Sequence, residues 1–172
     1  MLRMLGMVLV IGACTALGLS ARQKLVRRVN VITQMIQAFD FLIAEMQTNR
    51  TPLPSLISML SQQDLPGASV FFDRLRARLE RNDGLSFSYH WQRTAGEVSA
   101  EIGLEQAETD VLRQASSYLG RYQAEQQLAG LQHTKQDLAA IGRQAQQSLT
   151  TKGSIYRTCG IAVGVVVVLL ML

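Results

Sequence analysis

The 172-residue sequence has few of the residues on which metal sites and disulfide frameworks depend. It contains two cysteines and two histidines. Cys14 and Cys159 lie in apolar runs near the two ends, so no disulfide can form within the middle of the chain. His90 and His133 fall on different predicted helices, and no cysteine near them completes a zinc site. We therefore expect no metal centre.

Sequence motifs for catalysis and nucleotide binding are also missing. The chain has no Gly-x-x-x-x-Gly-Lys-Ser/Thr loop and no Gly-x-Gly-x-x-Gly motif. Glu97, Glu101 and Glu105 are spaced four residues apart, which is typical of a solvated helix face. The net charge of +4 is too mild to favour nucleic acid as a partner. We predict no catalytic residue and no cofactor.

What the sequence does contain is a long apolar run at each end. Met4–Ala21 has 18 residues without a charge, which as a helix span about 27 Å of a hydrocarbon core about 30 Å thick. Thr158–Leu172 is shorter and reaches the required length only if residues 153–157 join it. The sequence predicts transmembrane helices at 1–21 and 153–172, with one helical domain at 22–152.

The positive charges predict the orientation of these spans. Only Arg3 and the α-amino group precede the first span, so the positive-inside tendency places the central domain in the cytoplasm and both termini on the opposite side of the cell membrane. On the domain side, the basic residues close to the two spans are Arg22, Lys24, Arg27, Arg28, Lys152 and Arg157.

Small residues recur at four-residue spacing in both predicted spans. Gly160 and Gly164 form one such pair, and Gly12 with Ala16 forms the other. This spacing lets helices approach closely in lipid, so these residues are the candidates for packing the two spans together.

Another interpretation of the N-terminus stays open. Ile11, Gly12 and Ala13 precede Cys14 in the manner of the small-residue box before a lipid-modified cysteine. Processing there would make the chain an outward-facing, lipoprotein-like assembly factor. Against it, the apolar run continues beyond Cys14 to Ala21.

The central domain is helical by periodicity. Seven apolar residues at alternating four- and three-residue spacing mark one face of a long first helix, and a matching stripe marks a long last helix. The first stripe is Leu25, Val29, Ile32, Ile36, Phe39, Ile43 and Met46, and the last is Ala124, Leu128, Leu131, Leu138, Ala145 and Leu149. We expect these two helices to lie antiparallel, with four shorter helices between them.

Turn residues mark the limits of the four shorter helices. Thr51-Pro52-Leu53-Pro54 precedes a helix at 55–62, and Leu65-Pro66-Gly67 precedes one ending near Asn82. A further helix carries Trp91 and closes at Gly103. In the next one, the expected core stripe is Ala107, Val111, Ala115, Tyr118 and Leu119. The predicted fold is an all-α six-helix bundle flanked by two transmembrane helices.

Charge and proline content single out two candidate docking regions. One is the Arg50–Pro54 turn, and the other is a basic run interleaved with Asp73, Glu80 and Asp83. Arg76 and Glu80 are expected to pair on one face. The candidate docking residues are Arg50, Thr51, Pro52, Leu53, Pro54, Arg74, Arg76 and Arg78.

Several short motifs resemble those of a known family, the stage III sporulation protein AB family of endospore-forming bacteria, whose domain is similar to the cytoplasmic domains of type II secretion protein F. The resemblance covers nearly the whole chain, although Ser116 and Gln123 depart from the family pattern at one helix junction. It is carried by Met1–Gly6, Glu45, Thr51–Pro54, Trp91, Leu119-Gly120 and Gln126-Gln127.

The resemblance implies a non-enzymatic scaffold. It implies a platform in the mother-cell membrane facing the forespore, within the channel complex that links the two compartments. The implied partners are other stage III sporulation proteins, including a cytoplasmic ATPase coupled to the channel, the lipid bilayer and further copies of the chain. A membrane-tethered sensor that binds a small ligand is an alternative, and a cluster of buried ionisable groups would favour it.

Overall fold

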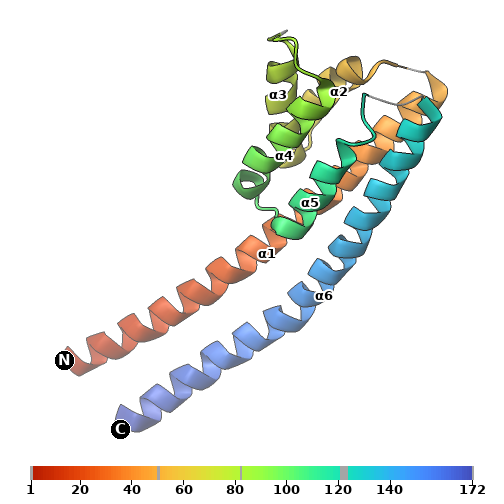
Figure 1. Ribbon diagram of the computed structural model, residues 1–172. Helices are drawn as coiled ribbons and strands as arrows, with labels where there is room; N and C mark the ends of the chain where they lie inside the picture. The colour runs from red at the N-terminus through yellow and green to blue at the C-terminus, as the bar shows by residue number, and fades with distance from the viewer. Residues whose placement is uncertain (1, 50, 82, 121–123, 172) are drawn as a thin grey trace. The chain divides into compact units, whose positions relative to one another are not determined.

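Six α-helices make up the described part of the chain, and no strand occurs in it (Figure 1). The computed structural model describes residues 20, 22–49, 51–81, 83–120 and 125–151; for the other residues of the first and last helices it gives the helix bounds alone. The helices are α1 (Leu2–Thr48), α2 (Leu53–Ser61), α3 (Ala68–Leu79), α4 (Phe87–Ile102), α5 (Gln106–Ala115) and α6 (Ala124–Met171).

The chain divides into two compact units. Residues 28–143 form the first, which we call the bundle unit, and the two ends of the chain, 1–27 with 144–172, form the second. The predicted spans, with Gly12, Ala16, Gly160 and Gly164, lie outside the described residues apart from Ser20.

Within the described residues, no helix has the length and hydropathy of a membrane span.

Within the bundle unit, α1 and α6 pack side by side. Lys135 Nζ lies 2.6 Å from Asp40 Oδ1, and a Cβ built on Gly142 would lie 3.0 Å from Ile32 Cγ2. From one contact to the other, the residue number increases along α1 and decreases along α6. The two helices are therefore antiparallel, as predicted. Gly142 interrupts the apolar stripe of α6 at a point where side chains of α1 lie against it.

The core is built around one tryptophan. Trp91, 1% exposed, makes ring contacts with Phe39 of α1, Phe71 and Phe72 of α3, and Phe87 of its own helix. Its indole Nε1 donates a 2.7 Å hydrogen bond to the carbonyl oxygen of Leu112, which satisfies the buried polar atom and joins α4 to α5. Edge-on ring pairs of this kind add to the stabilisation from burial itself.

Proline and glycine define the helix ends, with small shifts from the predicted limits. α2 begins at Leu53, two residues before the predicted start, because proline is tolerated in the first turn, where amide groups have no partner within the helix. α4 ends at Gly103 as predicted, and Gly103 has a φ of 94°, a left-handed conformation that favours glycine.

The predicted core stripe of α5 is wrong at its start, although Ala115 and Leu119 are buried as predicted. Ala107 is exposed and Val111 is half-buried, whereas Glu108 and Leu112 are fully buried. Apolar spacing alone gives no reason to expect Glu108 in the core, since burying an unpaired carboxylate is costly. The helix also ends at Ala115, earlier than expected, and residues 116–120 form turns.

Candidate functional site

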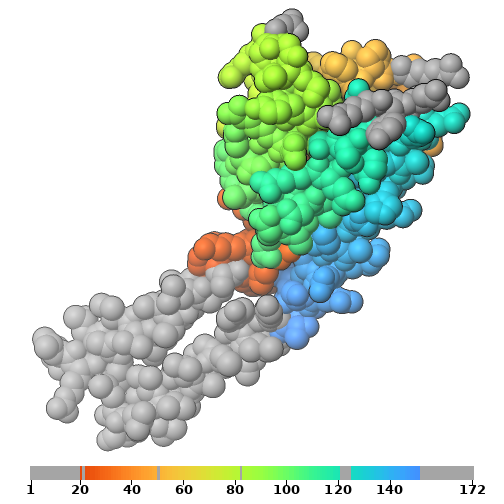
Figure 2. Space-filling view, in the orientation of Figure 1, coloured from red at the N-terminus to blue at the C-terminus, as the bar shows by residue number. Residues whose placement is uncertain are grey.

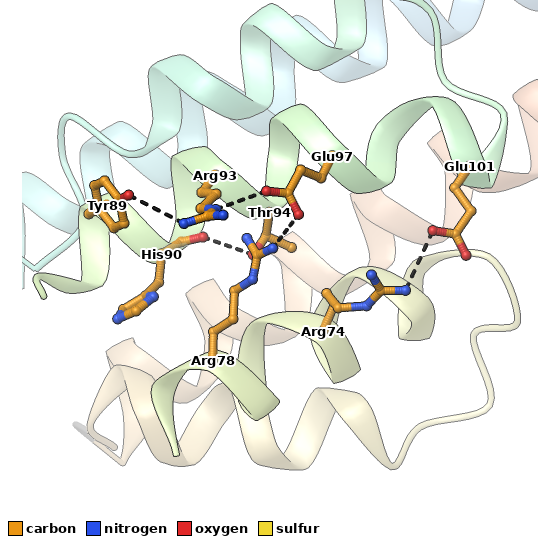
Figure 3. Close-up of polar contacts among 8 residues, drawn as sticks. All are labelled: Arg74, Arg78, Tyr89, His90, Arg93, Thr94, Glu97 and Glu101. Atoms are coloured by element: carbon orange, nitrogen blue, oxygen red, sulfur yellow. Dashed lines mark hydrogen bonds and ion pairs between the residues drawn. The ribbon is translucent and has the colours of Figure 1, made fainter. Parts of the chain in front are cut away.

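The first candidate surface lies where α3 and α4 pack against each other (Figure 3). Arg78 of α3 crosses to α4, where its Nη1 donates a 3.2 Å hydrogen bond to Thr94 Oγ1 and its Nη2 pairs with Glu97. The Arg78 side chain is only 13% exposed. It therefore acts first as a connection between the two helices.

Glu97 stands at the centre of this surface. Its carboxylate also accepts a 2.9 Å hydrogen bond from Arg93 Nε. The hydrogen bond from Arg93, followed by that from Arg78, lowers the pKa of Glu97 below its ordinary value. Conversely, hydrogen bonds to Glu97 and to the Tyr89 hydroxyl raise the pKa of Arg93. The four side chains thus form one charged network.

Exposed side chains of this network, and of the loop before α4, are of types that favour protein contacts. Tyr89 and Leu85 are 43% and 50% exposed, and Arg93 is 56% exposed. Tyrosine and arginine are the residues most often responsible for binding energy at protein interfaces. Arg93 Nη1 lies 3.5 Å from the Tyr89 hydroxyl, so the two side chains are held together in the unbound surface (Figure 3). We call Arg74, Leu85, Tyr89 and Arg93 the α3–α4 surface.

The other predicted docking arginines differ in their surroundings. Arg74 Nη2 lies 3.6 Å from Glu101 across the helix pair, and both side chains are about half exposed. Arg76 instead pairs within α3, 3.1 Å from Glu80, which confirms that predicted pair, and 3.9 Å from Asp73. The predicted basic run is therefore a set of ion pairs, of which Arg74 belongs to the α3–α4 surface.

The second candidate site is an apolar groove of about 450 Å³. The predicted Thr-Pro-Leu-Pro turn forms one side of it, next to residues from the end of α1, the start of α4, the Gly120 turn and the start of α6. The predicted docking residue Arg50 lies outside the described residues. The described residues of its lining are Met46, Thr51, Pro52, Leu53, Pro54, Phe87, Gly120 and Gln127.

Two features hold this groove open. Phe87 is stacked against Trp91, with ring centroids 6.1 Å apart, so it is fixed to the core. Gly120 has a φ of 77°, and a Cβ at this position would lie 3.1 Å from Phe87 Cβ. A side chain there would be strained and would crowd the groove. The absence of a side chain at Gly120 therefore leaves Phe87 accessible.

A cluster of ionisable groups centred on the buried Glu108, which the sequence did not reveal, joins α1 to α5. Arg28 donates to Glu108 Oε1 from Nε at 2.9 Å and from Nη2 at 2.5 Å, and its Nη1 lies 2.7 Å from Glu105. Glu108 is fully buried, and its second oxygen accepts the Glu105 amide at 2.9 Å. Because both Glu108 oxygens already have protein donors, we interpret this cluster as a structural clamp rather than a ligand site.

Both histidines pair with aspartates. His90 is buried, with Nε2 3.0 Å from Asp83 Oδ1, and His133 is exposed, with Nδ1 2.9 Å from Asp137 Oδ2. In the described part of the chain no three histidine, cysteine or acidic side chains gather in a way that could hold a metal ion.

The described side chains of α4, α5 and the start of α6 form a continuous surface on the face shown in Figure 2.

Of the two candidate sites, the sequence had indicated the turn and the arginines but not their surroundings. The sequence signal for the groove was indirect. The Thr-Pro-Leu-Pro turn, Gly120 and Gln127 each belong to the family resemblance, and all of them line the groove.

Comparisons with known proteins agree with the motifs. The model of the family described as "Stage III sporulation protein AB" matches residues 3–172. The chain is 24% identical over 172 residues, all of both chains, to stage III sporulation protein AB of Bacillus subtilis (strain 168). A solved structure of a stage III sporulation protein AB has the same fold, with a TM-score of 0.63 and 23% identity, covering 72% of this chain and 97% of that one. This chain therefore belongs to the stage III sporulation protein AB family.

Proposed function

We propose that this protein is a non-enzymatic platform, anchored at both ends in the mother-cell membrane, that docks other proteins of the stage III channel complex on its cytoplasmic bundle. The α3–α4 surface is the observation that carries the proposal. It presents Arg93, held by its ion pair with Glu97, and Tyr89, held by a hydrogen bond from Arg93, so binding loses little freedom of these two side chains.

The apolar runs at the two ends support the anchoring. Residues 4–21 and 158–172 carry no charged side chain, and the bundle unit begins and ends at Arg28 and Arg143, shortly after one run and before the other. Basic residues beside both runs favour a cytoplasmic bundle with both termini on the opposite side of the membrane. In this arrangement Gly12, Ala16, Gly160 and Gly164 serve the packing of the two spans.

The partner that we assign to the α3–α4 surface is the cytoplasmic ATPase of the complex. Arg74 and Arg93 give the surface exposed positive charge, while Glu97 and Glu101 neutralise part of it. Rim charges of this kind govern association rate and partner choice more than affinity. We therefore expect the ATPase to present carboxylates around an apolar contact for Leu85 and Tyr89.

Binding of the ATPase to the full chain in lipid nanodiscs tests this assignment. The combined variant Arg74→Glu, Tyr89→Ala and Arg93→Glu should lower the affinity at least about tenfold, because it removes hot-spot side chains and reverses two charges. Arg143→Glu, an exposed arginine of α6, is the matched control. Arg78 is left unchanged because it connects α3 to α4. Equal binding by the surface variant and the control would refute the assignment.

The anchoring is tested in a spore-forming host that lacks the gene. Arrest after engulfment, with loss of late forespore gene expression, should be rescued by the intact chain but not by a chain without residues 1–21 and 153–172. Normal spores in the deletion strain would refute the channel role. Labelling with a fatty acid, abolished by Cys14→Ser, would instead support the outward-facing lipoprotein interpretation.

A further inference from the structure

The apolar groove is separate from the α3–α4 surface, since none of its lining residues belongs to that surface. We propose that the groove binds a short segment of a partner protein that carries neighbouring aliphatic side chains followed by a lysine or arginine. The inference adds a second contact site to the platform and rests on the proposed function only in taking the occupant to be a protein.

The lining decides the chemistry of the buried part of the ligand. Met46, Leu53, Phe87 and two prolines supply most of it, while the hydroxyl of Thr51 and the amide of Gln127 are its polar side-chain groups. No arginine or lysine among the described residues lines the groove. A phosphate or carboxylate would find no charge partner among these residues, whereas an aliphatic side chain loses its contact with water at no such cost.

The size and rigidity of the groove favour a short segment. A volume of about 450 Å³ is near the lower end of the range for small-molecule sites, enough for a few side chains. Phe87 is stacked on the buried Trp91, and the two prolines have fixed φ angles. The groove is therefore formed before binding, and a ligand does not have to order it.

Glu45 supplies the electrostatic part of the argument. Its Oε2 lies 3.5 Å from the Thr51 hydroxyl of the lining and 2.9 Å from Asn49 Nδ2, so the carboxylate stands at the edge of the groove. Among the residues that the structure describes, no arginine, lysine or histidine lies within ion-pair distance of it. A cationic side chain beside the aliphatic ones complements this carboxylate, whereas an anionic one is repelled.

The test uses short peptides and the full chain in lipid nanodiscs. The probe is acetyl-Leu-Leu-Lys-amide, compared with acetyl-Leu-Leu-Glu-amide and acetyl-Ser-Ser-Lys-amide. The ¹³C-labelled ε-methyl group of Met46 reports on the groove, and that of Met59, which is 45% exposed and not part of the lining, is the internal control. The leucine-lysine peptide should shift the Met46 resonance in a saturable manner at millimolar concentration and leave Met59 unchanged.

Three variants assign the response. Thr51→Phe fills the groove and should abolish the shift, whereas Ser55→Phe, in the same segment but outside the lining, should keep it. Glu45→Gln should keep leucine-dependent binding but remove a preference of about threefold for lysine over glutamate, the size expected of a partly exposed ion pair. Unchanged circular dichroism would show that each variant is folded.

Several results would overturn the inference. They are an unmoved Met46 resonance, an equal response to the serine peptide, and equal affinity for the lysine and glutamate peptides. Broadening of Met46 by a spin-labelled lipid, without any response to peptide, would assign the groove to the bilayer instead. None of these measurements depends on sporulation or on the ATPase, so this inference and the proposed function can fail separately.

Discussion

Removing the Arg28 side chain should destabilise the bundle unit more than any surface substitution. Arg28→Met keeps most of the aliphatic volume but deletes both hydrogen bonds to Glu108, which is fully buried. The Glu108 carboxylate would then retain the Glu105 amide as its hydrogen-bond donor. Removal of one partner of a buried ion pair costs about 3–5 kcal/mol, and the Arg28 side chain, 15% exposed, allows some access of water. We expect a loss of about 3 kcal/mol.

Two further variants separate the buried contact from the exposed one. Glu105 is 63% exposed, so Glu105→Gln should cost less than about 1 kcal/mol. Arg28→Met combined with Glu108→Gln removes the uncompensated charge along with its partner. The double variant should therefore lose less stability than the sum of the losses of the two single variants, and the difference should be about 1–3 kcal/mol.

The single tryptophan provides the assay. Trp91 is 1% exposed, so its emission shifts to longer wavelength when the bundle unfolds. In urea, a loss of about 3 kcal/mol moves the midpoint by about 1–3 M, given the slopes of small domains. A midpoint for Arg28→Met within experimental error of the unmodified chain, or strictly additive losses in the double variant, would refute the role of this ion pair.

Three other predictions concern single side chains. Gly130→Ala places a Cβ 2.5 Å from the Tyr118 ring, so it should cost about 1–3 kcal/mol despite the better helix propensity of alanine; no loss in urea unfolding would argue against this contact. Arg78→Ala removes the α3–α4 connection and should cost about 1–2 kcal/mol in the same assay. Arg93→Ala should raise the pKa of Glu97, followed by ¹³C NMR of the carboxyl group, because the hydrogen bond from Arg93 is the largest cause of its lowering. A lowered folded-state pKa contributes stability above the ordinary glutamate pKa, and this contribution disappears as the pH falls through the lowered value, so the acid side of the stability profile should change in this variant.

The periodic features of the fold could be predicted because they depend on local spacing alone. Ile32, Phe39 and Ile43 follow one helical stripe, and all three are buried in the core. The end of α4 follows in the same way, because Gly103 adopts the left-handed conformation that its position after an apolar helix favours.

The buried face of α5 could not be predicted in this way. Glu108 is buried because Arg28, 80 residues earlier, neutralises it, and no local pattern contains that information. The groove is a similar case. The sequence indicates only that Thr51 and Gly120 belong to turns. The tertiary fold brings both residues together with Phe87 in the lining of the groove. The assignment of binding roles therefore required the arrangement of the helices.

The pairing of α1 with α6 has a consequence for the synthesis of the protein. Asp40 and Lys135 are 95 residues apart, and Leu131 and Leu138, two of the α6 residues buried in the core, follow all four short helices in the sequence. A ribosome adds about 5–20 residues per second, so the part of α1 that packs against α6 waits several seconds for its partner. During that interval the nascent chain exposes a surface that resembles an unfolded protein. We therefore expect its production to depend on chaperones that recognise apolar helices, and on translation that is not interrupted between α5 and α6.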